Sequence, residues 1–113
     1  MLKSIFCFAI LSFSGLAFAE RPLFTISLEK HLFYPDQLII PANTKIKLIV
    51  INHDNTPEQF DSFELNREKV IFPHSQGIIF IGPLAPGEYH FFGEYHQNSA
   101  LGKIIVLENK DAH

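Results

Sequence analysis

Short apolar runs separated by turn-forming residues recur along most of the chain. The run over 45–52 (KIKLIVIN) alternates most regularly, because Ile46, Leu48 and Val50 share one face. The full set of runs is 23–28, 37–40, 45–52, 77–82, 87–94 and 102–108. Runs of this length that are rich in Ile, Val and Phe predict strands, so the pattern predicts an all-β sandwich or barrel with antiparallel pairing.

Residues 53–76 interrupt this pattern. The segment Glu58–Lys69 (EQFDSFELNREK) is half charged, and Phe60, Phe63 and Val70 recur at intervals of three and seven. That spacing predicts one short helical segment, while a solvated crossover between two sheets is the alternative. In a helix the carboxylates of this segment would share one face, and they would form either an acidic patch or a solvated surface. These carboxylates belong to Asp61, Glu64 and Glu68.

The first residues have the layout of a secretory signal peptide. Lys3 precedes the apolar run Ile5–Leu11, and Ala17–Ala19 forms the small-x-small pattern that signal peptidase cuts. A membrane anchor is the competing interpretation, but serines and a glycine interrupt an apolar stretch that is already short for a bilayer of about 30 Å. We therefore predict a cleaved leader over residues 1–19 and a single periplasmic domain over residues 20–113.

The sulfur residues narrow the possible functions. Of 113 residues, 47% are apolar, the formal net charge is −3, and the only Cys and Met are Cys7 and Met1, both in the predicted leader. A mature chain without sulfur excludes disulfide scaffolds, zinc ribbons, iron–sulfur clusters and Cys-nucleophile enzymes. Mixed charges near neutrality argue against nucleic-acid binding. The serines lack the sequence context of a nucleophile elbow and no Gly-rich phosphate loop follows a strand, so an enzyme is not indicated.

Two stretches together resemble the cupredoxin family, the copper-binding β-sandwiches that include plastocyanin. The first is 51–60 (INHDNTPEQF), and the second is 86–96 (PGEYHFFGEYH), which continues into the predicted last strand. Segments 33–41 and 44–52 also fit early strands of the family, so the resemblance covers residues 24–108. It implies a Greek-key β-sandwich of about seven or eight strands with one short helical crossover.

Position by position, the chain departs from the ligand set of that family. Glu58 stands where the first His ligand would be, Gly93 stands where the copper-binding Cys would be, and His96 falls on the second His. The axial Met is absent. A blue-copper site requires the Cys thiolate, so the resemblance implies that this chain lacks type 1 copper.

Glu58, His96 and, more weakly, Glu94 are therefore the candidate metal ligands. Carboxylates with imidazole suit iron, Mn(II), Zn(II) or Cu(II). Each residue also has a structural interpretation: Glu58 could lie in the first turn of a helix, and His96 could be a hydrogen-bonded surface residue. Strand alternation would turn Glu94 away from Tyr89 and Phe91.

The remaining histidines are weaker candidates. His90 shares a strand face with Glu94, which is typical of a cross-strand surface residue. His53 and Asp54 border the Glu58 loop and are secondary candidates. The others, expected in loops or at a terminus, are His31, His74 and His113.

The combination of 56–70 (TPEQFDSFELNREKV) with 91–96 (FFGEYH) is similar to the EfeO-type cupredoxin-like domains of bacterial periplasmic iron-uptake systems. This resemblance implies a periplasmic metal-binding protein that serves iron or copper uptake through an inner-membrane permease. Two alternatives stay open. One is a metal-free interaction module, and the other is a ferroxidase-type enzyme whose carboxylates would stabilise Fe(III).

Overall fold

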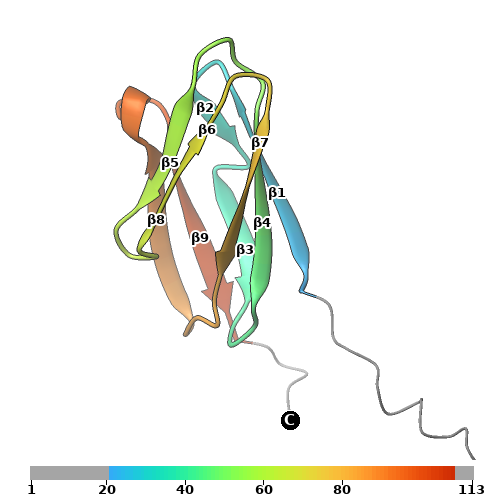
Figure 1. Ribbon diagram of the computed structural model, residues 1–113. Coiled ribbons are helices and arrows are strands. Elements are labelled where there is room, and N and C mark those ends of the chain that lie inside the picture. Colours follow the sequence, from blue (N-terminus) through green and yellow to red (C-terminus); the bar gives the residue numbers. More distant parts are fainter. Residues whose placement is uncertain (1–20, 109–113) are drawn as a thin grey trace, which may run out of the picture.

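The computed structural model describes residues 21–108, which form two β-sheets packed face to face (Figure 1). One sheet has the strand order β2-β1-β4-β7, and the other has the order β3-β9-β8-β5-β6. The elements are β1 (Leu23–Glu29), β2 (Leu32–Tyr34), β3 (Gln37–Pro41), β4 (Ile46–Asn52), β5 (Glu58–Ser62), β6 (Arg67–Ile71), β7 (Gln76–Ile81), β8 (Gly87–Gly93), the 3-10 helix η2 (Glu94–His96) and β9 (Leu101–Leu107). Within this part of the chain, no helix has the length and apolar character needed to cross a membrane. The predicted leader, residues 1–19, lies outside the described residues.

The predicted β-sandwich is confirmed, although its pairing is mixed. β1 pairs with β4 and β3 pairs with β9 in parallel, while the other pairs are antiparallel. A parallel pair needs a crossover connection. Here β3 supplies one, because it belongs to the second sheet and separates β1 from β4 along the chain.

The core lies between the two sheets. Ile46, Leu48 and Val50 of β4 are fully buried, as their alternation predicts. Beside them the rings of Phe60 and Phe91 stack at 4.9 Å between centroids, and Phe33 meets Phe91 edge-on at 5.1 Å. Stacked and edge-on aromatic pairs add stabilisation beyond the apolar area that they bury.

The predicted helical segment over Glu58–Lys69 is wrong. This segment forms β5 and β6, an antiparallel hairpin with Phe60 in the core and Asp61 opposite Glu68. Its charges suit β6, which is the edge strand of its sheet, because charged edge strands resist pairing with other chains. The spacing of three that suggested a helix instead spans a strand and a turn, where Asn66 takes a left-handed φ of 57°. The 3-10 helix η2 is the helical element of the described chain.

Where the backbone ladder between β5 and β8 ends, side chains make the hydrogen bonds to β8. The backbone ladder pairs Phe60 with Gly93 and Asp61 with Phe92. Further along, Ser62 Oγ donates to the carbonyl of His90 at 2.6 Å, and Glu64 accepts from both the backbone N–H and the ring Nδ1 of His90. The β5–β6 turn is thereby fastened to β8.

We expect the stabilising effect of Glu64 to depend on pH. The His90 backbone N–H, then the His90 ring, hold the pKa of Glu64 below its ordinary 4.5. A lowered carboxyl pKa means that the stabilisation is present above about pH 4.5 and is lost as the pH falls through the lower, folded-state value. The difference in unfolding free energy between wild type and Glu64→Gln should therefore be small but largest near neutrality, and should shrink in acid.

Urea unfolding between about pH 3 and about pH 7 measures this difference. The matched control is Glu29→Gln, which alters an exposed carboxylate at the end of β1. A wild-type advantage that stays constant down to the lowest pH, or a control that behaves in the same way, would contradict the assignment.

Candidate metal centre

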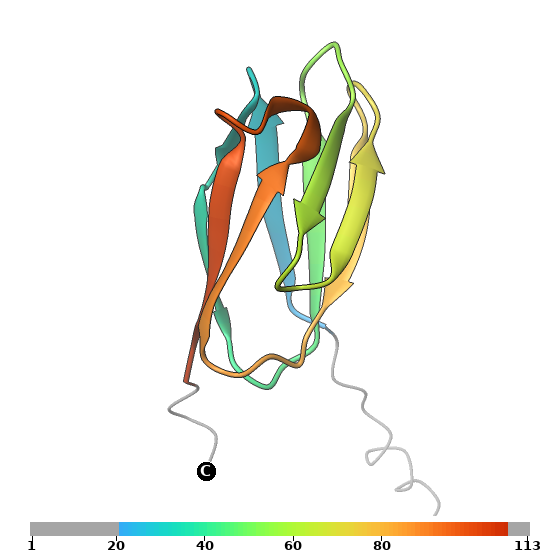
Figure 2. The ribbon, with the colours of Figure 1, turned by 90° about the vertical axis from the view of Figure 1, so that its left-hand side faces the viewer.

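Three connections meet at one end of the sandwich. Because β1 and β4 run parallel, with Leu28 beside Asn52, the turn after β1 lies next to the loop after β4. β8 ends at the same place, since Gly93 pairs with Phe60 near the start of β5. Figures 1 and 2 show the β1–β2 turn, the β4–β5 loop and η2 gathered at this end. Residues distant in sequence are thus brought together.

Glu58 is the buried centre of this end. It is the first residue of β5, and only 2% of its surface is exposed. Its Oε1 accepts the backbone N–H groups of Gln59 at 3.0 Å and Tyr95 at 2.8 Å, and its Oε2 lies 2.7 Å from Nδ1 of His96. The carboxylate therefore joins the start of β5 to η2.

Gly93 makes the room that this carboxylate needs. A Cβ atom at position 93 would lie 2.6 Å from both Cδ and Oε2 of Glu58, and 2.7 Å from Cβ of Ala100. Real Cβ atoms do not approach other atoms so closely. The Glu58 carboxylate thus occupies the space into which a side chain at position 93 would project.

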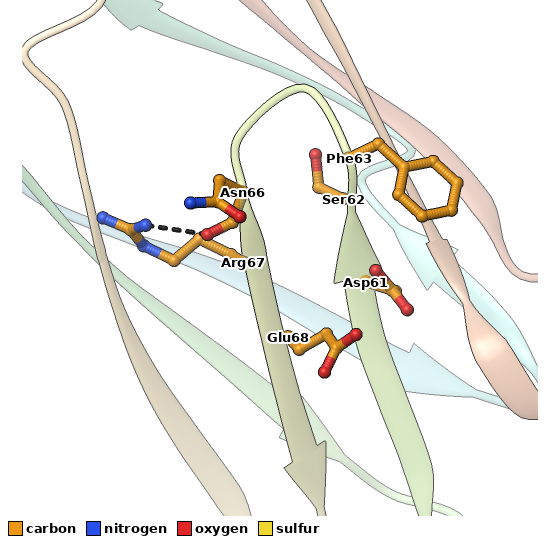
Figure 3. Close-up of a pocket in the computed structure, with 6 residues that line it drawn as sticks. All are labelled: Asp61, Ser62, Phe63, Asn66, Arg67 and Glu68. Carbon is orange, nitrogen blue, oxygen red and sulfur yellow. Dashed lines mark hydrogen bonds between the residues drawn. The ribbon is translucent and has the colours of Figure 1, made fainter.

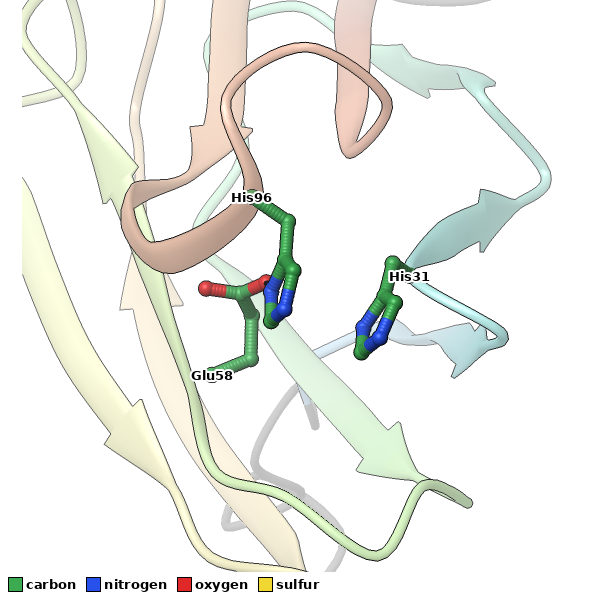
Figure 4. Close-up of side chains that lie close together, drawn as sticks. All are labelled: His31, Glu58 and His96. Atoms are coloured by element: carbon green, nitrogen blue, oxygen red, sulfur yellow. Dashed lines mark hydrogen bonds and ion pairs between the residues drawn. The ribbon is translucent and has the colours of Figure 1, made fainter.

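His31 completes the cluster from the β1–β2 turn. Its ring stacks on that of His96, with centroids 3.5 Å apart and planes 13° from parallel (Figure 4). Lys30 and His31 both take left-handed φ values, and Asp54 accepts both of their backbone N–H groups. The second oxygen of Asp54 also lies 3.4 Å from Nδ1 of His31. Asp54 therefore fixes both the turn and the ring it carries.

The predicted ligands are only partly brought together. Glu58 and His96 join His31 in a group whose potential ligand atoms all lie within 4.8 Å of one another. Glu94 is not in this group, because it is exposed at the start of η2, where its carbonyl accepts a bond from Gln97. The sequence placed His31 among the loop histidines. The only signal for it was its position in a polar turn just after the first predicted strand.

The secondary candidates also separate. Asp54 contributes to the site because it contacts the backbone and the ring of His31. His53 is exposed, and its backbone N–H donates to the carbonyl of Leu28. Asp61 and Glu68 face a different hollow of about 360 Å³ at the β5–β6 hairpin (Figure 3). There Asp61 already accepts a bond from Gln59 at 3.3 Å. The acidic residues of the hairpin therefore do not join the cluster.

The donors of the cluster are two imidazoles and one carboxylate. Residues 21–108 contain neither Cys nor Met, so the described chain offers no sulfur ligand. Imidazole suits Zn, Cu, Fe and Ni, and carboxylate oxygen suits harder ions. The residues present thus fit a borderline divalent or iron ion.

Two mixed sheets with a polar cluster at one end, contributed by a turn, the start of β5 and η2, define a cupredoxin-like β-sandwich. The chain belongs to the cupredoxin-like domain family, whose sequence profile matches residues 2–106. It is also 46% identical over 81 residues to the uncharacterized protein RP394 of Rickettsia prowazekii (strain Madrid E). That match covers 72% of this chain and 65% of the relative, so the chain spans less than two thirds of its length.

Solved structures with the same fold include several copper proteins. The metal-binding domain of the Cu(I)-exporting P-type ATPase CopA of Streptococcus pneumoniae D39 matches with a TM-score of 0.65 and 17% identity, over 81% of this chain and 93% of that one. A copper-binding protein in its apo form matches with a TM-score of 0.66 and 16% identity, over 75% and 86%. Auracyanin A, a blue copper protein of Chloroflexus aurantiacus, matches with a TM-score of 0.67 and 12% identity, over 78% and 100%. At these identities the likeness concerns the fold alone.

Proposed function

We propose that this protein binds iron or copper in the periplasm and passes the ion to an inner-membrane permease. The observation that carries the proposal is the cluster of His31, Glu58 and His96 at one end of the sandwich. The copper-binding proteins that share the fold support it, as does the resemblance to EfeO-type domains. The periplasmic location rests on the predicted leader over residues 1–19.

The proposed site is not a type 1 copper site. The described residues include no Cys to supply a thiolate. The space at position 93 is filled by the carboxylate of Glu58, with which a Cβ atom there would collide. A bound ion would be held by nitrogen and oxygen ligands. These ligands would stabilise its positive charge.

One observation favours a metal-free interaction module as the second candidate. Among the described residues no fully buried side-chain nitrogen or oxygen lacks a hydrogen-bond partner, so the buried carboxylate of Glu58 is satisfied without an ion. A ferroxidase-type enzyme is the third candidate. It would use the same donors, and oxygen consumption on adding Fe(II) would reveal it.

Anaerobic titration with Fe(II), Cu(II) and Zn(II) tests the proposed function. We expect equimolar binding at micromolar concentration or tighter, with affinity reduced at least about tenfold in Glu58→Ala and further in His96→Ala. The matched control is His74→Ala, because His74 is an exposed histidine whose ring contacts Asn55 rather than the cluster. Binding only at about millimolar ion, or equal binding by both variants and wild type, would overturn the proposal.

A further inference from the structure

Each imidazole of the cluster has a carboxylate beside its Nδ1 atom. Nδ1 of His96 lies 2.7 Å from Oε2 of Glu58, and Nδ1 of His31 lies 3.4 Å from Oδ2 of Asp54. An ionised carboxylate can only accept a hydrogen bond, so the bond from the His96 ring to Glu58 favours the tautomer of His96 with its proton on Nδ1, and the longer ion-pair contact with Asp54 biases His31 in the same direction. That tautomer leaves Nε2 of each ring with a free lone pair. Histidines that ligate metals usually have their other ring nitrogen held in this way.

We propose that both histidines bind the ion through Nε2, with Glu58 and Asp54 as positioning residues rather than ligands. This inference rests on the proposed function, and it divides the roles within the same site. It changes the part played by Glu58 from donor to support, and it adds Asp54 to the residues on which affinity depends.

Burial supports this division of roles. The Glu58 side chain is 2% exposed, whereas those of His96 and His31 are 29% and 39% exposed. Both Glu58 oxygens are already engaged, by two backbone N–H groups and by the His96 ring. An ion on Glu58 would have to displace one of these bonds inside a closed space. An ion bound by the two Nε2 atoms would be held by imidazole side chains that are already partly exposed to solvent.

The stacking of the rings identifies His31 as the residue that adjusts. Lone pairs of imidazole lie in the ring plane, and two planes 13° from parallel do not direct their lone pairs toward one point. One ring must turn before both can share an ion. His96 is held at 2.7 Å by a buried carboxylate, while His31 is more exposed and lies 3.4 Å from its own. His31 therefore turns, and Asp54 limits how far.

Nuclear magnetic resonance of the ¹⁵N-labelled protein tests this arrangement, with Zn(II) as a diamagnetic probe. Without Zn(II), we expect the proton of His96 on Nδ1 and Nε2 unprotonated. On addition of Zn(II), the Nε2 signals of His31 and His96 should shift as ligands do, while the carboxyl carbon of Glu58 should move little. A proton on Nε2 of His96, or a large shift of the Glu58 carboxyl carbon, would overturn the inference.

The conservative variants Glu58→Gln and Asp54→Asn provide a second measurement. Each should weaken Zn(II) and Cu(II) binding about 10- to 100-fold, as expected for residues that hold a ligand. Each should also raise the population of the other tautomer of the histidine beside it, an effect that a merely structural role would not produce. The matched control Glu108→Gln, at an exposed carboxylate just after β9, should leave both quantities unchanged.

The possible failures can be distinguished. If the wild type binds none of Fe(II), Cu(II) and Zn(II), the proposed function fails, and this inference fails with it. If binding is tight and lost in His96→Ala, but the Glu58 carboxyl shifts strongly or Asp54→Asn binds as well as wild type, the function stands and the division of roles is wrong.

Discussion

Replacing Gly93 by Ala is expected to destabilise the protein by about 2–3 kcal/mol, because the new methyl group overfills a closed space. The methyl carbon would lie 2.6 Å from the Glu58 carboxylate and 2.7 Å from Cβ of Ala100. Relief by moving Glu58 would break its bonds to the backbone of Gln59 and Tyr95. Ion binding should weaken as well, because the same movement releases the ring of His96.

A double-mutant cycle with Glu58→Ala isolates the cause. In the Glu58→Ala background the space is empty, so adding Gly93→Ala should cost at least about 1 kcal/mol less than it does in wild type. A residual cost should remain from the contact with Ala100. Urea unfolding of the four proteins measures the coupling. Strictly additive costs would show that the carboxylate and position 93 do not compete for one space.

Replacing Asn52 by Leu is expected to cost about 3–4 kcal/mol, because it leaves three backbone groups around a buried side chain without their partners. Asn52 is fully buried at the end of β4. Its Nδ2 donates to the carbonyls of Thr56 at 2.9 Å and Ile71 at 3.1 Å, and its Oδ1 accepts the N–H of Asp54 at 2.8 Å. Leu keeps the approximate size but none of these bonds.

The same substitution should also weaken ion binding, since Asn52 holds the loop that carries Asp54 and leads to Glu58. Thermal or urea unfolding, together with a Zn(II) titration, measures both effects. Asn55→Ala is the matched control, because Asn55 belongs to the same loop but is exposed and bonds the ring of His74 rather than the cluster. A loss of stability below about 1 kcal/mol for Asn52→Leu would show that other contacts hold the loop.

The strands could be predicted where buried residues alternate with more exposed ones along the strand. β4 has this pattern over its whole length. The hairpin of β5 and β6 could not be predicted in this way. β6 is an exposed edge strand without alternating burial, and its charges resemble those of a solvated helix. The pairing of β1 with β4 depends on β3 crossing to the other sheet, which no local pattern records.

The candidate site was predictable to the extent that it lies in the two stretches that resemble cupredoxins, 51–60 and 86–96. Glu58 and His96 could be found by comparing this chain with the cupredoxin pattern, and the loss of Cys at Gly93 drew attention to the same place. His31 could not be found in this way, because its approach depends on the parallel register of two strands and on the left-handed turn that Asp54 holds. Glu94 lies within the second of these stretches, but the chain turns into η2 there and leaves Glu94 exposed.

The distances along the chain between cluster residues have a consequence for folding. The bond from His96 to Glu58 spans 38 positions, and the bond that ties Ser99 to His31 spans 68. Contacts this far apart form only after long chain segments have been ordered, so an unfolded chain cannot offer this set of donors. An ion that binds only the native state at a hundred times its dissociation constant would add about 2.7 kcal/mol of stability. Under the proposed function, the availability of the ion would therefore set the fraction of molecules that are unfolded and exposed to proteases.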